Sequence, residues 1–161
     1  MKNRGFSLIE VIIVLILISL SISLVAPSLS RFSMTVELKG AAKKVSAILR
    51  YCRSEAVNQG KVYQVIFNSD LREVRVQSIE ENEEDAGTKD KATPKIYPLP
   101  RGVDIKEVKV TSPENPSEIP TIEFYPNGGS NGGTILLNSR DRKGYRINIH
   151  FITGMVTVEK V

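Results

Sequence analysis

The sequence predicts an α+β protein in which a long N-terminal helix packs on an antiparallel β-sheet head. Residues 6–25 are apolar or small, apart from a single charged residue, Glu10. Apolar residues then recur at intervals of three and four between positions 38 and 56, which is the spacing of one helix face. After Gly60 the apolar period changes to two, as expected for strands with one buried face.

The N-terminal apolar run has the length of a membrane-spanning helix. Twenty residues rising 1.5 Å each span roughly 30 Å, the thickness of a bilayer's hydrocarbon core. A carboxylate inside such a span costs about 2.5–3.5 kcal/mol, so Glu10 requires a reason. One explanation without a functional role is that the Glu10 carboxylate reaches to the membrane interface or is protonated. A secretory signal peptide is disfavoured by the length of the run and by Glu10 itself.

The start of the chain resembles the N-terminus of type IV prepilins: a short basic leader, the junction Gly5-Phe6, and a lone Glu10 five residues into the apolar run. The resemblance implies that residues 1–5 are a leader removed by a prepilin peptidase, which then methylates the new amino terminus at Phe6. It also implies a transmembrane helix over 6–28 in the inner membrane and a periplasmic C-terminal domain.

Glu10 then has a physical partner. Cleavage after Gly5 leaves a cationic amino group about one helical turn from the carboxylate of a neighbouring subunit, and opposite charges attract strongly in low dielectric. Glu10 is therefore predicted to be an assembly contact. Pro27, which cannot donate the helical hydrogen bond, predicts a kink and is another feature shared with pilins.

Residues 29–60 are predicted to form an amphipathic helix that is the spine of the head and ends at Gly60. Its apolar stripe consists of Leu38, Ala41, Val45, Ile48, Cys52 and Ala56. Cys52 is interpreted as a small buried hydrophobe, with a catalytic thiolate as the alternative. As the only cysteine it excludes an intramolecular disulfide.

Residues 61–161 are predicted to form the β-rich head. Strands 61–67 and 73–79 form a hairpin around the turn cluster that starts at Asn68. Residues 80–95 include a strongly acidic loop, for which calcium binding is an alternative to simple solvation; the carboxylate spacing matches no EF-hand. No bound metal is predicted.

Six further strands are expected at 96–99, 103–110, 121–125, 134–138, 145–152 and 155–159. Pro98 and Pro100 indicate a sheet edge. The glycine cluster 128–133 is interpreted as a hairpin turn between 121–125 and 134–138, because it lacks the ending of a phosphate loop. Phe151 is expected to face inward with Ile147 and Ile149, and His150 to face solvent.

Residues 124–135 and the terminal stretch 153–158 narrow the resemblance to the minor pseudopilins called general secretion pathway protein H and their minor-pilin relatives. This implies a low-abundance structural subunit of the inner-membrane-anchored periplasmic pseudopilus that drives protein secretion by the type II secretion system. The partners implied are other pseudopilins, the prepilin peptidase and the inner membrane. Neither a cofactor nor a small-molecule substrate is expected.

The same residues bear on other possible functions. One histidine, one cysteine and loop carboxylates supply no set of nucleophile, base and orienting group, so no enzyme is predicted. The alternative is a minor type IV pilin for pilus assembly or DNA uptake. DNA binding needs clustered cations, but the net charge of +4 falls to +2 without Lys2 and Arg4. The arginines typical of the DNA-binding relatives are also missing after Gly154.

Overall fold

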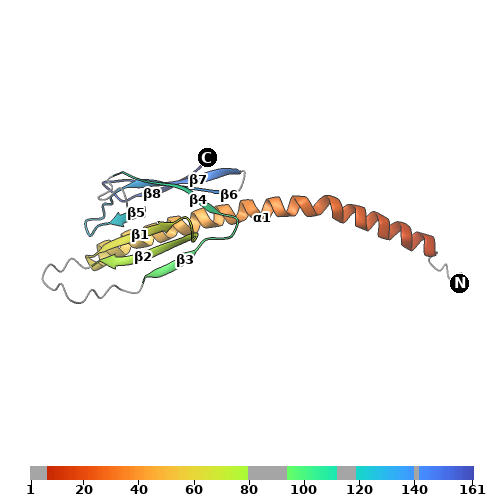
Figure 1. The fold of residues 1–161 in the computed structure, drawn as a ribbon, viewed down its shortest axis with the longest axis horizontal. Coiled ribbons are helices and arrows are strands. Elements are labelled where there is room, and N and C mark those ends of the chain that lie inside the picture. Colours follow the sequence, from red (N-terminus) through yellow and green to blue (C-terminus); the bar gives the residue numbers. More distant parts are fainter. Residues whose placement is uncertain (1–6, 80–93, 112–118, 140–141) are drawn as a thin grey trace. The chain divides into compact units, whose positions relative to one another are not determined.

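The computed structural model describes residues 7–79, 94–111, 119–139 and 142–161 (Figure 1). The chain divides into two compact units, Met1–Val36 and Glu37–Val161. One helix and eight strands make up the described elements. The fold is the predicted α+β arrangement, and all eight strands lie within a few residues of the expected positions. The acidic loop lies outside the described residues, except at its end, where Lys95 already belongs to a strand.

Helix α1 (Leu8–Gln59) is one continuous element across both predicted helical segments. It ends where Gly60 takes a φ of 65°, the left-handed conformation that glycine adopts at helix ends. Pro27 lies within α1. The structure does not describe the side chains at 23–33, so the kink at Pro27 stays a prediction. In the described part of the chain, no helix is both long enough and apolar enough to cross a membrane.

The first sheet has the strand order β3-β2-β1-β5 and is antiparallel throughout. Strands β1 (Val62–Asn68) and β2 (Glu73–Ile79) form the predicted hairpin, with Val65 opposite Val76. Strand β3 (Lys95–Pro98) is an edge strand, as its prolines indicated. Strand β5 (Thr121–Phe124) pairs with β1 at the other edge.

The second sheet has the order β4-β6-β7-β8 and is also antiparallel. It consists of β4 (Asp104–Val110), β6 (Gly133–Ser139), β7 (Arg142–Ile149) and β8 (Val156–Lys160). The predicted pairing of 121–125 with 134–138 is therefore wrong, although the chain does turn back as far as an isolated antiparallel bridge between Phe124 and Ser130. The glycine-rich segment leads from one sheet to the other, and β6 pairs with β4 and β7 instead of β5.

The side chain of Asn131 explains this crossing. Its Oδ1 accepts a hydrogen bond from the Glu123 backbone N–H (3.0 Å), and its Nδ2 donates one to the Thr121 carbonyl (3.0 Å). These contacts occupy the open edge of β5, so the following residues pair elsewhere. A Cβ on Gly133 would lie 2.5 Å from the Lys109 carbonyl oxygen, which only glycine avoids where the chain enters the second sheet.

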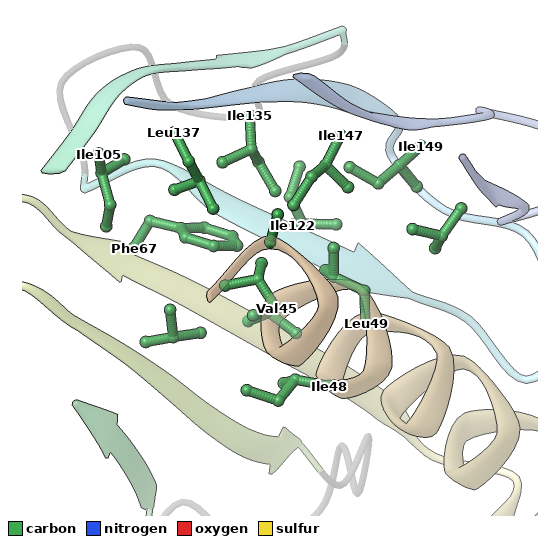
Figure 2. Packing of buried hydrophobic residues seen from close by; sticks show 14 of the residues in the cluster. Val45, Ile48, Leu49, Phe67, Ile105, Ile122, Ile135, Leu137, Ile147 and Ile149 are labelled. Carbon is green, nitrogen blue, oxygen red and sulfur yellow. The ribbon is translucent and has the colours of Figure 1, made fainter. Parts of the chain in front are cut away.

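The core lies where α1 and the two sheets meet. Figure 2 shows Val45 and Leu49 of α1 close to Ile122 of the first sheet and Ile135 and Ile147 of the second. All six residues of the predicted helix stripe are buried, as are both neighbours Ala42 and Leu49. At about 25 cal/mol per Å², burial of this apolar surface is the main force that holds helix and sheets together.

One predicted core residue is on the outside. Strand β7 ends at Ile149, and residues 150–155 form a loop, so the alternation expected to continue to Phe151 stops early. The side chains of Ile147 and Ile149 are buried as predicted, whereas Phe151 is 51% exposed. The expectation for Phe151 was wrong because hydrogen bonds within the loop, and from Ser130 and Arg53 to it, override the strand period.

Candidate functional site

The first candidate site is the beginning of α1, where Ser7 caps the helix. The Ser7 hydroxyl accepts a hydrogen bond from the Glu10 N–H at 3.3 Å, and the Ser7 carbonyl accepts from Glu10 and Val11 at 3.1 and 3.3 Å. Glu10 is therefore fixed in the first helical turn, where the helix dipole favours a negative charge. Gly5 and Phe6, the predicted cleavage and methylation positions, lie outside the described residues.

An apolar surface surrounds the Glu10 carboxylate. Leu8 and Ile9 are 79% and 65% exposed, and the large apolar residues from Val11 to Ile22 are all exposed as well. Among the residues described, no cation lies within ion-pair distance of Glu10. Among the described residues, the Glu10 carboxylate therefore has no cationic partner, and the apolar side chains around it are exposed.

The hydroxyl groups of two serines within this apolar stretch donate hydrogen bonds to backbone carbonyls of the same helix. Ser19 Oγ donates to the Leu15 carbonyl and Ser21 Oγ to the Leu17 carbonyl, both at 2.8 Å. Back-bonding of this kind leaves no hydroxyl proton unpaired when a helix loses contact with water. The contacts could have been anticipated from the sequence, because serine commonly bonds to the carbonyl four residues earlier.

The two residues considered for catalysis have structural roles. Cys52 is fully buried in the core, and burial raises the pKa of its thiol to about 12, with the nearby Glu55 charge adding to the effect. The thiol is thus neutral at physiological pH, which confirms its interpretation as a small hydrophobe. His150 is exposed as expected, and its Nδ1 lies 3.2 Å from Thr153 Oγ1, within the 150–155 loop.

A second candidate surface lies near the C-terminal end of α1. Arg53 Nε donates to the carbonyls of Gly128 (3.2 Å) and Thr153 (2.8 Å), and Arg50 Nη2 donates to the Val156 carbonyl (3.1 Å). Arg53 therefore ties the 126–129 turn and the 150–155 loop to the helix, and Arg50 ties the start of β8 to it. The carbonyl partners of the two arginines could not be predicted from the sequence, since no local pattern encodes them.

Within the described ranges, no three side chains among His, Cys, Asp and Glu come together as a possible metal site. The acidic residues for which calcium was an alternative lie outside those ranges, at 80–91.

Known protein families match both the N-terminal segment and the head of this chain. Residues 1–26 match the prokaryotic N-terminal methylation motif, and residues 41–152 match the family of type II transport protein GspH. The chain is 26% identical over 153 residues to type II secretion system protein H of Xanthomonas campestris pv. campestris, an alignment that covers 95% of this chain and 81% of that protein.

Two solved structures share the fold. One is the minor pseudopilin EpsH from the type 2 secretion system of Vibrio cholerae, with a TM-score of 0.58 and 13% identity, covering 77% of this chain and 97% of that one. The other is the type IV minor pilin FimU of Pseudomonas aeruginosa, with a TM-score of 0.54 and 20% identity, covering 80% and 92% of the two chains. Because the GspH match spans most of the chain and follows a methylation motif, this chain belongs to the GspH family of type II transport proteins.

Proposed function

We propose that this protein is a minor pseudopilin, a structural subunit of the periplasmic pseudopilus of a type II secretion system. The observation that carries the proposal is the order of two independent matches along one chain, an N-terminal methylation motif followed by a GspH head. A capped helix with an exposed apolar surface, joined in sequence to a β-rich head with its own core, is the architecture that such a subunit needs.

The proposal includes processing and membrane anchoring. The prepilin peptidase cuts after Gly5 and methylates the amino group of Phe6, and residues 6–28 then anchor the subunit in the inner membrane with the head in the periplasm. The helix cap at Ser7 supports this order of events, because the helix starts just after the cut and needs no residue of the leader.

Glu10 makes the assembly contact in this proposal. The carboxylate pairs with the N-terminal ammonium of a neighbouring subunit, and the pairing neutralises two charges that would each be costly in an apolar environment. The exposed carboxylate within an exposed apolar surface supports this role. Other pseudopilins of the same filament are the partners, so the contact joins unlike subunits.

The second candidate is a minor type IV pilin, a function favoured by the fold shared with FimU. A shared fold at 20% identity does not distinguish a type II secretion system from a type IV pilus. The sequence match to the GspH family favours the secretion system. A minor pilin of the DNA-binding kind would also need clustered cations on its head, and the C-terminal residues after Gly154 contain only one lysine.

The test is to delete the gene in its host and restore it on a plasmid. We expect deletion to stop export of the secreted proteins, and the wild-type chain to restore it. Mass spectrometry of the restored protein should find a methylated N-terminus at Phe6. Intact Met1, a cut near Val25, or normal secretion without the gene would each contradict the proposal. Loss of surface pili with secretion unchanged would favour the second candidate.

A further inference from the structure

The loop at 150–155, between β7 and β8, exposes an unusual number of large apolar side chains. Phe151, Ile152 and Met155 are 51%, 74% and 60% exposed. Val57 in the last turn of α1 is 49% exposed and adjoins the same region, since a Cβ on Gly128 would lie 3.6 Å from its Cγ2 atom. We call these four side chains the apolar tip. Exposed apolar residues that gather in this way commonly mark an interaction site.

The backbone of the 150–155 loop is held by hydrogen bonds within the loop and by hydrogen bonds from two other segments. Within the loop, His150 N–H donates to the Met155 carbonyl (3.0 Å) and Gly154 N–H to the His150 carbonyl (2.8 Å). From outside it, Ser130 N–H donates to the Phe151 carbonyl at 3.0 Å, and Arg53 donates to the Thr153 carbonyl. Because the loop is already ordered, a partner that binds it pays less conformational entropy.

The core does not require these side chains. Ile149 and Val156, which flank the loop, are buried, while the side chains of Phe151, Ile152 and Met155 between them are exposed. A loop that only connects two strands is normally polar. The exposed phenylalanine, isoleucine and methionine are therefore best explained by a surface that covers them in the assembled state.

We propose that the apolar tip docks against the head of another subunit of the same filament. This inference rests on the proposed function and adds to it the surface that makes the contact. The size of the tip argues for such a partner. Stable complexes between free proteins bury about 1,200–2,000 Å², more than four partly exposed side chains supply. The tip therefore suits subunits that are already tethered side by side, where the effective concentration is high.

The location of the apolar tip also supports another subunit as the partner. Within the unit Glu37–Val161, the tip includes Val57 and adjoins Arg53, at the C-terminal end of α1. The opposite end of this unit carries Gly102, next to Glu37, and the 69–72 turn, whose Arg72 bonds to the Arg101 carbonyl. In a filament of parallel helices, opposite ends of a head face successive subunits. The apolar tip, at one end of the head, then faces a neighbouring subunit.

A lipid surface is a weaker candidate for the occupant. Loops that insert into membranes combine apolar side chains with free cations that bind anionic headgroups. Arg53, the cation that bonds directly to this loop, is already engaged with two backbone carbonyls. The apolar tip therefore fits the apolar flank of a protein better than a bilayer.

The experiment places a photocrosslinking amino acid at position 152 of the full-length chain, in the host with its other pseudopilins. We expect irradiation to give an adduct that mass spectrometry identifies as another pseudopilin, and the adduct to disappear when Glu10→Ala blocks assembly. Adducts with lipid alone, adducts with a secreted protein, or no adduct in a strain whose secretion is normal would each overturn the inference. Failure of the wild-type chain to restore secretion would instead refute the proposed function.

Substitution provides a matched measurement. The double variant Ile152→Ser/Met155→Ser should lower co-purification with the partner pseudopilin about tenfold, because side chains at the centre of an interface dominate binding. Its unfolding temperature should stay close to wild type, since both side chains are exposed. Leu71→Ser is the control: Leu71 is 60% exposed in the 69–72 turn, at the other end of the unit. Equal co-purification of the double variant and wild type would overturn the inference.

Discussion

Glu10 combines two features, a carboxylate in a capped first helical turn and exposed apolar side chains around it. In water the first feature is mildly stabilising, because the helix dipole favours a negative charge there by about 0.3–1 kcal/mol. In an apolar assembly the second feature makes the charge costly unless a cation meets it. A single residue therefore links the fold of the helix start to the proposed assembly step.

Replacement of Glu10 by alanine separates processing from assembly. We expect Glu10→Ala to be inserted and cut after Gly5, because the leader and the Gly5-Phe6 junction are unchanged. Incorporation should fail, since removing one partner of a buried ion pair costs about 3–5 kcal/mol. Crosslinking to partner pseudopilins and secretion are the measurements, and Glu10→Asp should give intermediate values.

Glu55→Ala is the matched control for this experiment. It removes the same charge from the head half of α1, where Glu55 accepts a hydrogen bond from Gln59, and it should leave incorporation unchanged. Normal crosslinking and secretion by Glu10→Ala, at wild-type expression, would show that the carboxylate is no assembly contact.

The 150–155 loop shows how one glycine sets the form of a whole element. Gly154 has a φ of 59°, and a Cβ at this position would lie 2.6 Å from the Gly128 carbonyl oxygen and 3.0 Å from Arg53 Cδ. The left-handed conformation and the approach of a backbone oxygen both require glycine. Gly154 thus allows the loop, the 126–129 turn and α1 to come together.

Two glycine-to-alanine substitutions test this account. Gly154→Ala should destabilise the protein by about 2 kcal/mol or more, through backbone strain and the clash with Gly128. Gly40→Ala should stabilise it by about 0.5–1 kcal/mol, because Gly40 is inside α1 and a Cβ there would meet no atom within 4 Å. Thermal unfolding of the full chain in detergent measures both, and equal midpoints for the two variants would contradict the strain argument.

The contacts of several cations in the described part of the head bear on the choice between secretion and DNA uptake. Arg50, Arg53 and Lys44 of the head are all engaged with backbone carbonyls, and Lys109 pairs with Glu107. Cations held in this way are less available to replace the counterions of a phosphate backbone.

We therefore expect the purified full-length protein to bind double-stranded DNA weakly or not at all at physiological salt. A gel-shift titration at two salt concentrations is the measurement, with a basic DNA-binding protein as the positive control. Sub-micromolar affinity that falls steeply with salt would favour the minor-pilin alternative.

Features with a local period were predictable from the sequence. The buried stripe from Leu38 to Ala56 follows the helical repeat, and Val65 and Phe67 follow the strand repeat, so their burial needed no knowledge of distant residues. The helix end at Gly60 was predictable for the same reason, because a glycine after the last periodic residue is a local signal. Glu10 was identified by its contrast with the apolar residues around it.

Features that depend on distant partners were decided by the tertiary structure alone. The sequence placed β6 correctly but not its neighbours, because the Asn131 side chain occupies the edge of β5 and sends the chain to the second sheet. Phe151 points outward because Arg53 and Ser130, far away in sequence, fix its loop. Period determines which face of an element is buried, but hydrogen bonds between remote segments determine where each element ends and which strand it joins.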